Sequence, residues 1–399
     1  MSKPVTYLLV GGGSGGHLAP LIPIAQSIKK LDPDSIVIHI GQSGDKLNEM
    51  LKSESSIDKF YTVTAGKFRR YNGESFITRL FDIKTNLLNL RDFFKFIYGI
   101  IQSYLLIRRL SPNIVFTKGG FVCAPVGIAS RLRNVPYVTH DSDAMVSLAH
   151  RIISKKAVLH LTAMPVEYYA QYPEGKTRQV GIPVRTEYIQ ISDDEKEKLK
   201  EKLRFNNSSK ILLVVGGGLG ARNINNTVIA GSSELLLDTE VVIVHITGHK
   251  LYDNVISEYE KQDIDKNRVV CLPFTNKLYL YSAVADVVIS RAGATNMAEL
   301  SAQAKACIIV PNPLLAGGHQ LKNAEVFEKS KSAIIVHEDE LSKSLIRTAI
   351  ELLNDKLKQK ELSTNLKQGV ILDASDKIAK ILTETASNKP TSEVNVGGL

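Results

Sequence analysis

The chain has 399 residues, and single hydrophobic cores stop growing at about 250–300 residues, so we expect two domains. Hydrophobic residues make up 44% and charged residues 23% of the sequence, a balance that excludes a disordered or fibrous protein. The formal net charge of +9 favours an anionic partner, such as a phosphate-bearing substrate, an acidic lipid surface or a nucleic acid.

The first half begins with an apolar strand at residues 7–10, which runs into the glycine-rich segment GGGSGGH at 11–17 and then into a helical pattern at 18–31. Further short strands are expected at 36–40, 113–117 and 135–138. The longest apolar stretch, residues 93–107, is interrupted by Lys95, Gln102 and Ser103. It is shorter than the roughly 20 apolar residues of a membrane-spanning helix, so none is predicted.

The second half repeats this plan. After a charged helix at 193–205, an apolar strand at 211–215 runs into GGGLGA at 216–221 and a second helical stretch, and strands follow at 241–246, 286–290 and 307–311. Alternating strands and helices predict parallel, doubly wound sheets, so we expect two α/β domains of similar plan with a cleft between them. We place the domains at 1–184 and 185–372, with a boundary at the GIPVR segment, and expect a loose polar tail at 387–399.

Both glycine segments fit the G-x-G-x-x-G/A pattern, at Gly11, Gly13 and Gly16 and again at Gly216, Gly218 and Ala221. A dinucleotide site would also need a carboxylate at the end of the next strand, and those ends read IGQSG and ITGHK. NAD and FAD are therefore disfavoured, and we expect no cofactor. A helix start behind a glycine turn can still bind an anion or a closely approaching sugar, although each loop could also be a purely structural turn.

Four polar clusters follow predicted strands: KGGFVCAP at 118–125, THDSDA at 139–144, SRAGATNMAEL at 290–300 and GGHQLKNA at 317–324. Doubly wound sheets bind ligands at the carboxyl ends of their strands, so the four together indicate a binding site. Taken singly, His140, Asp141 and Asp143 could cap a helix, and His319, Gln320 and Asn323 could be a solvated helix start. Asp141 and Asp143 form an Asp-x-Asp pair without a second ligand cluster, and the three cysteines form no Cys-x-x-Cys pair, so no metal site is expected.

Eight segments in order resemble the MurG family of glycosyltransferases: GGGSGGH-x-x-P at 11–20, GKFRR at 66–70, KGGFVCAP at 118–125, HDSDA at 140–144, GIPVR at 181–185, GGGLGARNIN at 216–225, SRAGATNMAEL at 290–300 and HQLKNA at 319–324. The resemblance implies the GT-B architecture, with two Rossmann-like domains and a C-terminal helix at about 373–386 that returns to the first. It also implies an inverting transfer of GlcNAc from UDP-GlcNAc to the 4-hydroxyl of undecaprenyl-diphospho-MurNAc-pentapeptide, in peptidoglycan synthesis. A peripheral protein on the cytoplasmic face of the membrane is then expected.

Carried over by position, the resemblance puts the donor site in the second half. Glu299 would accept hydrogen bonds from the ribose hydroxyls, and the backbone around Ala294 and Thr295 would meet the diphosphate. The other implied donor contacts are Thr275 at the uracil, Gln320 and Asn323 at the GlcNAc hydroxyls, Arg185 at the diphosphate and Gly218 through its backbone. The family usually has Ser-Gln where this chain has Gly218 and Leu219.

In the first half, the resemblance puts the acceptor against Gly13, Ser14, Gly15 and Gly16, with Asp143 also in the acceptor pocket. His17 is the first candidate for the general base, because a neutral imidazole is available near pH 7. Asp141 is the second candidate, since a carboxylate is ionised in that range. The family usually reads His-Glu-Gln-Asn where this chain reads HDSD at 140–143, so the first acid is shortened to Asp141 and an amide is replaced by a second acid, Asp143.

Other functions stay open on the sequence alone: a diacylglycerol glycosyltransferase, a UDP-GlcNAc 2-epimerase or a nucleotide-sugar sensor. Nucleic-acid binding is disfavoured, because the basic residues are not interleaved with a reader motif. Residues 66–110 carry nine basic against three acidic residues among several phenylalanines, which predicts attachment to an anionic membrane surface. The alternative is that 93–107 form an ordinary buried helix below a solvated basic face.

Overall fold

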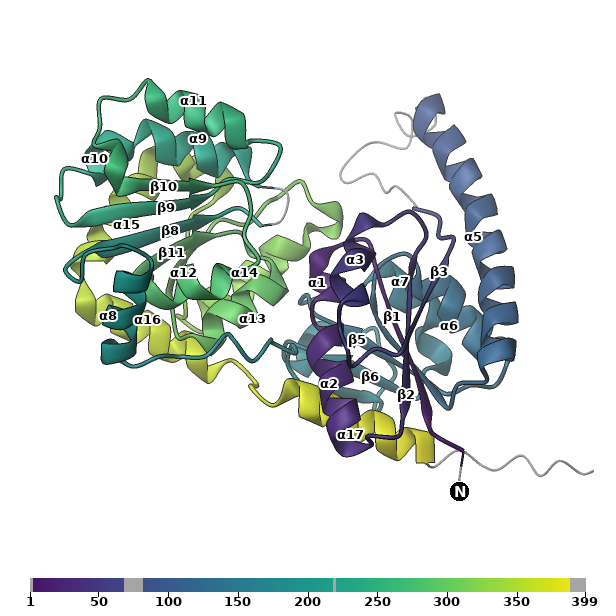
Figure 1. Ribbon diagram of the computed structural model, residues 1–399. Coiled ribbons are helices and arrows are strands. Elements are labelled where there is room, and N and C mark those ends of the chain that lie inside the picture. The colour runs from purple at the N-terminus through teal and green to yellow at the C-terminus, as the bar shows by residue number, and fades with distance from the viewer. Residues whose placement is uncertain (1–2, 68–81, 218–219, 388–399) are drawn as a thin grey trace, which may run out of the picture. The chain divides into compact units, whose positions relative to one another are not determined.

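The computed structural model describes residues 3–67, 82–217 and 220–387, and Figure 1 shows the course of the chain. The chain divides into two compact units. The first contains the residues up to Asp141, Val146–Pro183 and the residues from Asp373 onward, and the second contains Ser142–Met145 and Val184–Leu372. Three parts of the chain lie outside the described residues: Gly218 and Leu219, the GKFRR segment beyond Lys67, and the tail after Ser387.

The first unit is built on a seven-stranded parallel sheet in the order β3-β2-β1-β4-β5-β6-β7. Its strands are β1 (Thr6–Gly11), β2 (Ile36–Gln42), β3 (Lys59–Val63), β4 (Ile114–Gly119), β5 (Tyr137–Asp141), β6 (Leu159–Thr162) and β7 (Thr177–Gln179). The interior strand β1 is apolar on both faces: Tyr7 and Leu9 enter one core, and Leu8 and Val10 enter another. Burial on both faces is typical of parallel sheets with helical crossovers.

The helices of this unit are α1 (Gly15–Leu18), α2 (Leu21–Leu31), α3 (Glu49–Lys52), α5 (Ile83–Leu110), α6 (Cys123–Leu132), α7 (Leu148–Ile153) and α17 (Ala374–Ser387). The single helical pattern predicted at 18–31 is interrupted at Ala19 and Pro20. Proline has no backbone N–H and is favoured at a helix start, so a second helix begins there.

The C-terminal helix α17 packs against α2, from the opposite end of the chain (Figure 1). Ile378, Ala379 and Leu382 are fully buried in the core that also contains Leu21, Ile24 and Ile28. Two hydrogen bonds fix the docking: the Ser27 hydroxyl donates to Asp376 at 2.7 Å, and the Tyr7 hydroxyl donates to Thr383 Oγ1 at 3.1 Å. The last helix is therefore part of the first unit.

The second unit has a six-stranded parallel sheet in the order β10-β9-β8-β11-β12-β13. Its strands are β8 (Lys210–Val215), β9 (Val241–Ile246), β10 (Val269–Leu272), β11 (Val287–Ser290), β12 (Ala306–Ile309) and β13 (Ile334–Ile335). Its helices are α8 (Asp193–Lys202), α9 (Arg222–Ala230), α10 (Ser232–Leu235), α11 (Tyr252–Glu260), α12 (Leu278–Val284), α13 (Ala294–Ala302), α14 (His319–Lys329), α15 (Ile346–Asn354) and α16 (Lys356–Gln368). The predicted fold class, two doubly wound parallel α/β units, is confirmed.

Candidate functional site

The first glycine loop, after β1, packs closely on the loop after β4. A Cβ atom on Gly120, where φ is +92°, would lie 2.1 Å from the carbonyl oxygen of Gly12. A Cβ atom on Gly119, where φ is +140°, would lie 2.6 Å from Cδ2 of His17. Only glycine fits two backbones this close, so the glycines of KGGFVCAP let the β4 loop lie directly beside His17.

The hydrogen bonds of His17 define its tautomer. This half-buried residue is in the short helix α1, and its Nδ1 atom lies 2.9 Å from the Gly12 carbonyl oxygen and 3.0 Å from the Ser14 hydroxyl. A carbonyl oxygen can only accept, so Nδ1 carries the hydrogen. The neutral ring then has its lone pair on Nε2, and this nitrogen is able to accept a proton.

The glycine loop already holds a carboxylate. The backbone N–H of Gly13, where φ is +82°, donates to Asp45 Oδ2 at 2.7 Å. Gly15 has open space on its Cβ side, with no atom within 4 Å, and Gly16 follows it in α1. The loop is thus compatible with an anionic oxygen, but an acceptor diphosphate would have to displace Asp45 to reach the Gly13 N–H.

Asp141 is the last residue of β5 and is 4% exposed. One carboxylate oxygen accepts from His150 Nδ1 at 2.9 Å and from the Ser147 N–H at 3.1 Å, and the other accepts from the Tyr172 hydroxyl. Burial would raise the pKa of Asp141, but the charge and hydrogen bond of His150 outweigh it and hold that pKa well below its usual range. Both carboxylate oxygens of Asp141 are thus engaged, and one of them holds the loop at Ser147. A carboxylate with these contacts and a lowered pKa is a poor proton acceptor, which argues against Asp141 as the base.

Asp143 and Asn323 lie together within the second unit, although the sequence assigned them to different substrates. The Asn323 side chain is fully buried, and its amide donates to Asp143 Oδ1 at 2.8 Å and to the Ala292 carbonyl at 2.9 Å. Its oxygen accepts from the Ala144 N–H at 2.8 Å. Both amide hydrogens are thus used, so a sugar hydroxyl could add a bond only by donating to the amide oxygen. Gln320, which is 8% exposed, accepts from the Asn312 N–H at 2.9 Å.

Glu299, on α13, is half-buried and interacts with Arg185, the last residue of the GIPVR segment, and with Tyr188. Burial raises the pKa of Glu299 to about 7, although the Arg185 charge and a hydrogen bond with Tyr188 act in the opposite direction. Ala294 and Thr295 form the first turn of the same helix, behind Gly293, whose Cβ side is open. The backbone N–H groups of this turn and the Glu299 carboxylate lie on one helix.

Thr275 lies in the loop after β10, next to Phe274, whose ring stacks on His249 with centroids 5.4 Å apart. Phe274 is 43% exposed. His249 and Thr275 lie in the loops after β9 and β10, and Ala294 and Gln320 begin the helices that follow β11 and β12, so the four residues share the carboxyl edge of the sheet. Sequence reasoning missed His249, as it missed Asp45, Tyr188, His150 and Tyr172, because no local pattern marks them.

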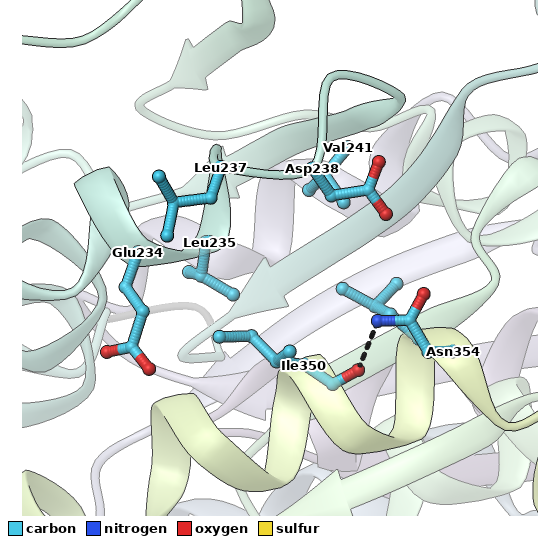
Figure 2. Close-up of a pocket in the computed structure, with 8 residues that line it drawn as sticks. Glu234, Leu235, Leu237, Asp238, Val241, Ile350 and Asn354 are labelled. Carbon is cyan, nitrogen blue, oxygen red and sulfur yellow. Dashed lines mark hydrogen bonds between the residues drawn. The ribbon is translucent and has the colours of Figure 1, made fainter.

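A cavity of about 230 Å³ lies near the opposite, amino-terminal edge of this sheet (Figure 2). The side chains of Leu235, Leu237 and Ile350 line it, and the carboxylates of Glu234 and Asp238 are at its rim. It contains none of the predicted site residues. In the described part of the chain, no group of three or more His, Cys, Asp or Glu side chains could hold a metal ion.

The comparisons with known proteins agree with the two-part plan. Residues 7–159 match the glycosyltransferase family 28 N-terminal domain, and residues 211–378 match the C-terminal domain of that family. A relative from Borreliella afzelii is 30% identical over 386 residues, which are 96% of this chain and 97% of its own. It is named UDP-N-acetylglucosamine–N-acetylmuramyl-(pentapeptide) pyrophosphoryl-undecaprenol N-acetylglucosamine transferase, as is a relative from Thermoanaerobacter sp. that is 28% identical over 380 residues, 94% of this chain and 98% of its own.

Among solved structures, Acinetobacter baumannii MurG matches with a TM-score of 0.71 and 19% identity, over 96% of this chain and 100% of that chain. The complex of Staphylococcus aureus MnaA with UDP matches with a TM-score of 0.66 and 12% identity, over 97% and 99%. A UDP-N-acetylglucosamine 2-epimerase has a TM-score of 0.63 and 12% identity, over 97% and 98%. These structures show the shared fold, whereas the full-length sequence similarity separates transferase from epimerase and confirms the predicted resemblance: the chain belongs to the MurG family of glycosyltransferases.

Proposed function

We propose that this protein transfers GlcNAc from UDP-GlcNAc to the 4-hydroxyl of undecaprenyl-diphospho-MurNAc-pentapeptide, with inversion at the anomeric carbon. The observation that carries the proposal is the similarity, along nearly the whole of both chains, to relatives named for this transfer. Two features of the geometry support it: a base-competent imidazole beside a glycine loop in one unit, and a carboxylate on a glycine-preceded helix in the other.

The second unit binds the donor in this proposal. Glu299 accepts from the two ribose hydroxyls, and the first turn of α13, at Ala294 and Thr295, donates backbone N–H groups to the diphosphate. Arg185 adds a positive charge at the diphosphate, and the backbone of Thr275 meets the uracil. Gln320 and Asn323 contact the sugar, and Gly218 contributes through its backbone.

The first unit supplies the glycine loop and the base. The acceptor diphosphate lies against Gly13, Ser14, Gly15 and Gly16. Asp143, which belongs to the second unit, is a further acceptor contact in this proposal. The 4-hydroxyl oxygen attacks the anomeric carbon from the face opposite to UDP, its proton passes to Nε2 of His17, and the bond from the anomeric carbon to UDP breaks. A positioned base of this kind typically contributes about 10²–10⁴-fold to the rate.

We also assign attachment to an anionic membrane surface to α5. One side of this helix packs on the first unit: Ser103 and Ile107 are buried, and a Cβ atom on Gly99 would lie 2.1 Å from the Thr64 carbonyl oxygen. The opposite side carries large exposed apolar residues at intervals of three or four: Leu87, Leu90, Phe94, Ile97, Ile101 and Leu105. Arg91, Lys95 and Arg109 are also exposed on this helix.

These exposed apolar residues form a stripe along α5. An ordinary buried helix, the alternative for residues 93–107, does not fit this stripe, since Phe94 is 64% and Ile101 53% exposed. Apolar side chains beside cations are the features of a helix that lies in the interface of an anionic bilayer. None of the helices in the described ranges is both long and apolar enough to cross a membrane. A peripheral attachment at the cytoplasmic face of the membrane is the localisation that we propose.

The transfer is tested by incubating the purified protein with labelled UDP-GlcNAc and a short-chain lipid-diphosphate acceptor. We expect a lipid-linked disaccharide and release of UDP, and the Glu299→Ala variant should bind UDP-GlcNAc at least about tenfold more weakly, because it loses two charge-assisted hydrogen bonds. Glu258→Ala, on an exposed face of α11, is the matched control and should bind normally.

Each competing function would give a different product in the same assay. A 2-epimerase would convert UDP-GlcNAc without an acceptor, and proton NMR would detect the epimer. A glycolipid synthase would transfer the sugar to diacylglycerol instead of the lipid diphosphate. Absence of any turnover would leave a nucleotide-sugar sensor and would contradict the proposal.

A further inference from the structure

A second cavity, of about 260 Å³, lies at the amino-terminal edge of the sheet in the second unit. Its walls come from α8, from the segments that lead into β11 and β12, and from one face of α16. The described residues that line it include four lysines and one aspartate: Lys196, Lys305, Lys356, Lys360 and Asp286. The cavity therefore gathers positive charge at the edge of the sheet opposite to the proposed donor residues.

Asp286 accounts for the positions of two of these lysines. Its Oδ1 atom accepts from Lys196 Nζ at 2.8 Å and from Lys356 Nζ at 3.3 Å, and its Oδ2 atom accepts from the Ile211 N–H at 2.8 Å. The carboxylate thus ties α8 and α16 to the sheet. An ammonium group has three hydrogens, so both lysines are still able to donate to a second acceptor in the cavity.

The other two lysines have no such partner. Lys305 is 9% exposed, and its Nζ atom donates to the carbonyl oxygens of Ala283 and Ala285 at 2.6 and 3.2 Å, which leaves one ammonium hydrogen. Lys360 is exposed on the face of α16 that lines the cavity. In the described ranges, neither Lys305 nor Lys360 forms an ion pair, so the role of Asp286 does not explain them.

A buried cation among other cations is costly without a counter-charge. Burial lowers the pKa of Lys305 to about 7 and Lys196 acts in the same direction, whereas Asp286 and Cys307 act to raise it. An anion in the cavity would be attracted by all four ammonium groups and would favour the charged form of Lys305. The arrangement is therefore more stable with a bound anion than without one.

We propose that this cavity binds a small phosphate-bearing anion, either free phosphate or diphosphate or the phosphate of a lipid headgroup. Ammonium groups bind phosphate oxygens as point charges, and these four come from three sides of the cavity. The cavity is smaller than the roughly 300–1,000 Å³ of sites for drug-sized ligands, which favours a small ligand. The inference does not depend on the proposed transfer, because none of these residues belongs to the proposed donor site.

Calorimetry with sodium diphosphate tests the site, with UDP at saturation to occupy the proposed donor site. We expect the unmodified protein to bind diphosphate, and Lys356→Gln with Lys360→Gln to bind it at least about tenfold more weakly, because two charged donors are lost. Equal binding by this double variant, or no binding to the unmodified protein, would overturn the proposal. In the second case the lysines only hold the helices, and the double variant would merely unfold at a lower temperature.

A matched control removes the same charge elsewhere in the second unit. Lys261→Gln with Lys358→Gln changes two lysines that pair with glutamates on their own helices and do not line the cavity. This control should bind diphosphate like the unmodified protein. An equal loss of binding in the control would show a general effect of net charge and would overturn the proposal.

Vesicles distinguish the two sources of phosphate. Both double variants are sedimented with vesicles of phosphatidylcholine alone and with vesicles that also contain phosphatidylglycerol. If Lys356→Gln with Lys360→Gln weakens diphosphate binding but binds anionic vesicles like the control, the site takes a free phosphate. If it weakens both, the site takes a lipid headgroup, and either result supports an anion site in this cavity.

Discussion

His17 is able to act as a base because of the groups that hold its other nitrogen. The Gly12 carbonyl oxygen and the Ser14 hydroxyl both lie within hydrogen-bonding distance of Nδ1. The glycine loop therefore does two things: its Gly13 N–H binds a carboxylate oxygen, and its Gly12 carbonyl oxygen orients the imidazole. Gly119 allows this arrangement, because any side chain there would collide with the ring.

We expect His17→Ala to lower kcat by at least about a hundredfold while the affinity for UDP-GlcNAc stays unchanged. Ser14→Ala should have a smaller effect on kcat, since the Gly12 carbonyl oxygen still holds Nδ1. Steady-state kinetics with both substrates varied will separate the possibilities. If the loss appears mainly in the acceptor KM, His17 positions the acceptor and is not the base.

Asp141 and His150 form a buried ion pair, since they are 4% and 0% exposed at their side chains. Burial would lower the pKa of His150, but the Asp141 carboxylate outweighs it and raises that pKa to about 10. The pKa of Asp141 is held below its usual range by the same pair. Because Asp141 also accepts from the Ser147 N–H, the pair fixes the end of the loop that contains Asp143.

This pair predicts a loss of stability at alkaline pH. The contribution of His150 is fully present below its unfolded pKa of about 6.5 and disappears as the pH rises toward about 10. The contribution of Asp141 is present above its unfolded pKa of about 3.9 and is lost on acidification through its lower, folded pKa. Hydrogen exchange of the β5 amides should therefore accelerate between about pH 7 and pH 10 beyond the intrinsic base-catalysed increase. His150→Asn should lack this additional acceleration, and an unchanged opening free energy in the unmodified protein would contradict the ion pair.

At the scale of elements, α5 combines a packed side with an exposed apolar side. We expect the protein to co-sediment with vesicles that contain anionic lipid, and Phe94→Ser with Ile101→Ser should release it, because both side chains are exposed at the centre of the stripe. Arg91→Gln with Lys95→Gln should weaken binding to anionic vesicles by about tenfold or more, at about 1 kcal/mol for each basic residue.

Leu237→Ser is the control for the vesicle experiment, since Leu237 is 80% exposed but lies in the second unit. It should bind vesicles like the unmodified protein. Equal binding of the unmodified protein to neutral and anionic vesicles would contradict the electrostatic part of the proposal. Normal vesicle binding by the double variant, Phe94→Ser with Ile101→Ser, would contradict the assignment of α5 as the attachment element.

For the whole molecule, the sequence predicted the fold class from local signals. Strand, glycine turn and helix follow one another at β1 and again at β8, and both of these interior strands contain continuous apolar runs. The four edge strands β3, β7, β10 and β13 were not predictable from local pattern, because they are short or mixed in burial. Strand β6 was not predicted either, since its LHLT sequence contains a polar residue at every second position.

The candidate site was predictable only where its residues belong to strand-end motifs. Glu299, Gln320 and Asn323 were identified from the resemblance, and their helices begin after strands as expected. Their partners could not be predicted, because Tyr188, His150 and Asp45 meet the motifs only after folding. The hydrogen bond between Asp143 and Asn323 joins residues that are 180 positions apart in the sequence. A motif of neighbouring residues cannot predict a contact over such a separation.

The docking of α17 on α2 has a consequence for synthesis of the chain. The core of the first unit includes residues made among the first thirty and others made after residue 373. A ribosome must therefore translate the whole second unit while Leu21, Ile24 and Ile28 still lack the helix that covers them. A prematurely terminated chain keeps this apolar surface open to water, which favours its recognition by chaperones and proteases. The first unit is thus completed only after the whole second unit has been made.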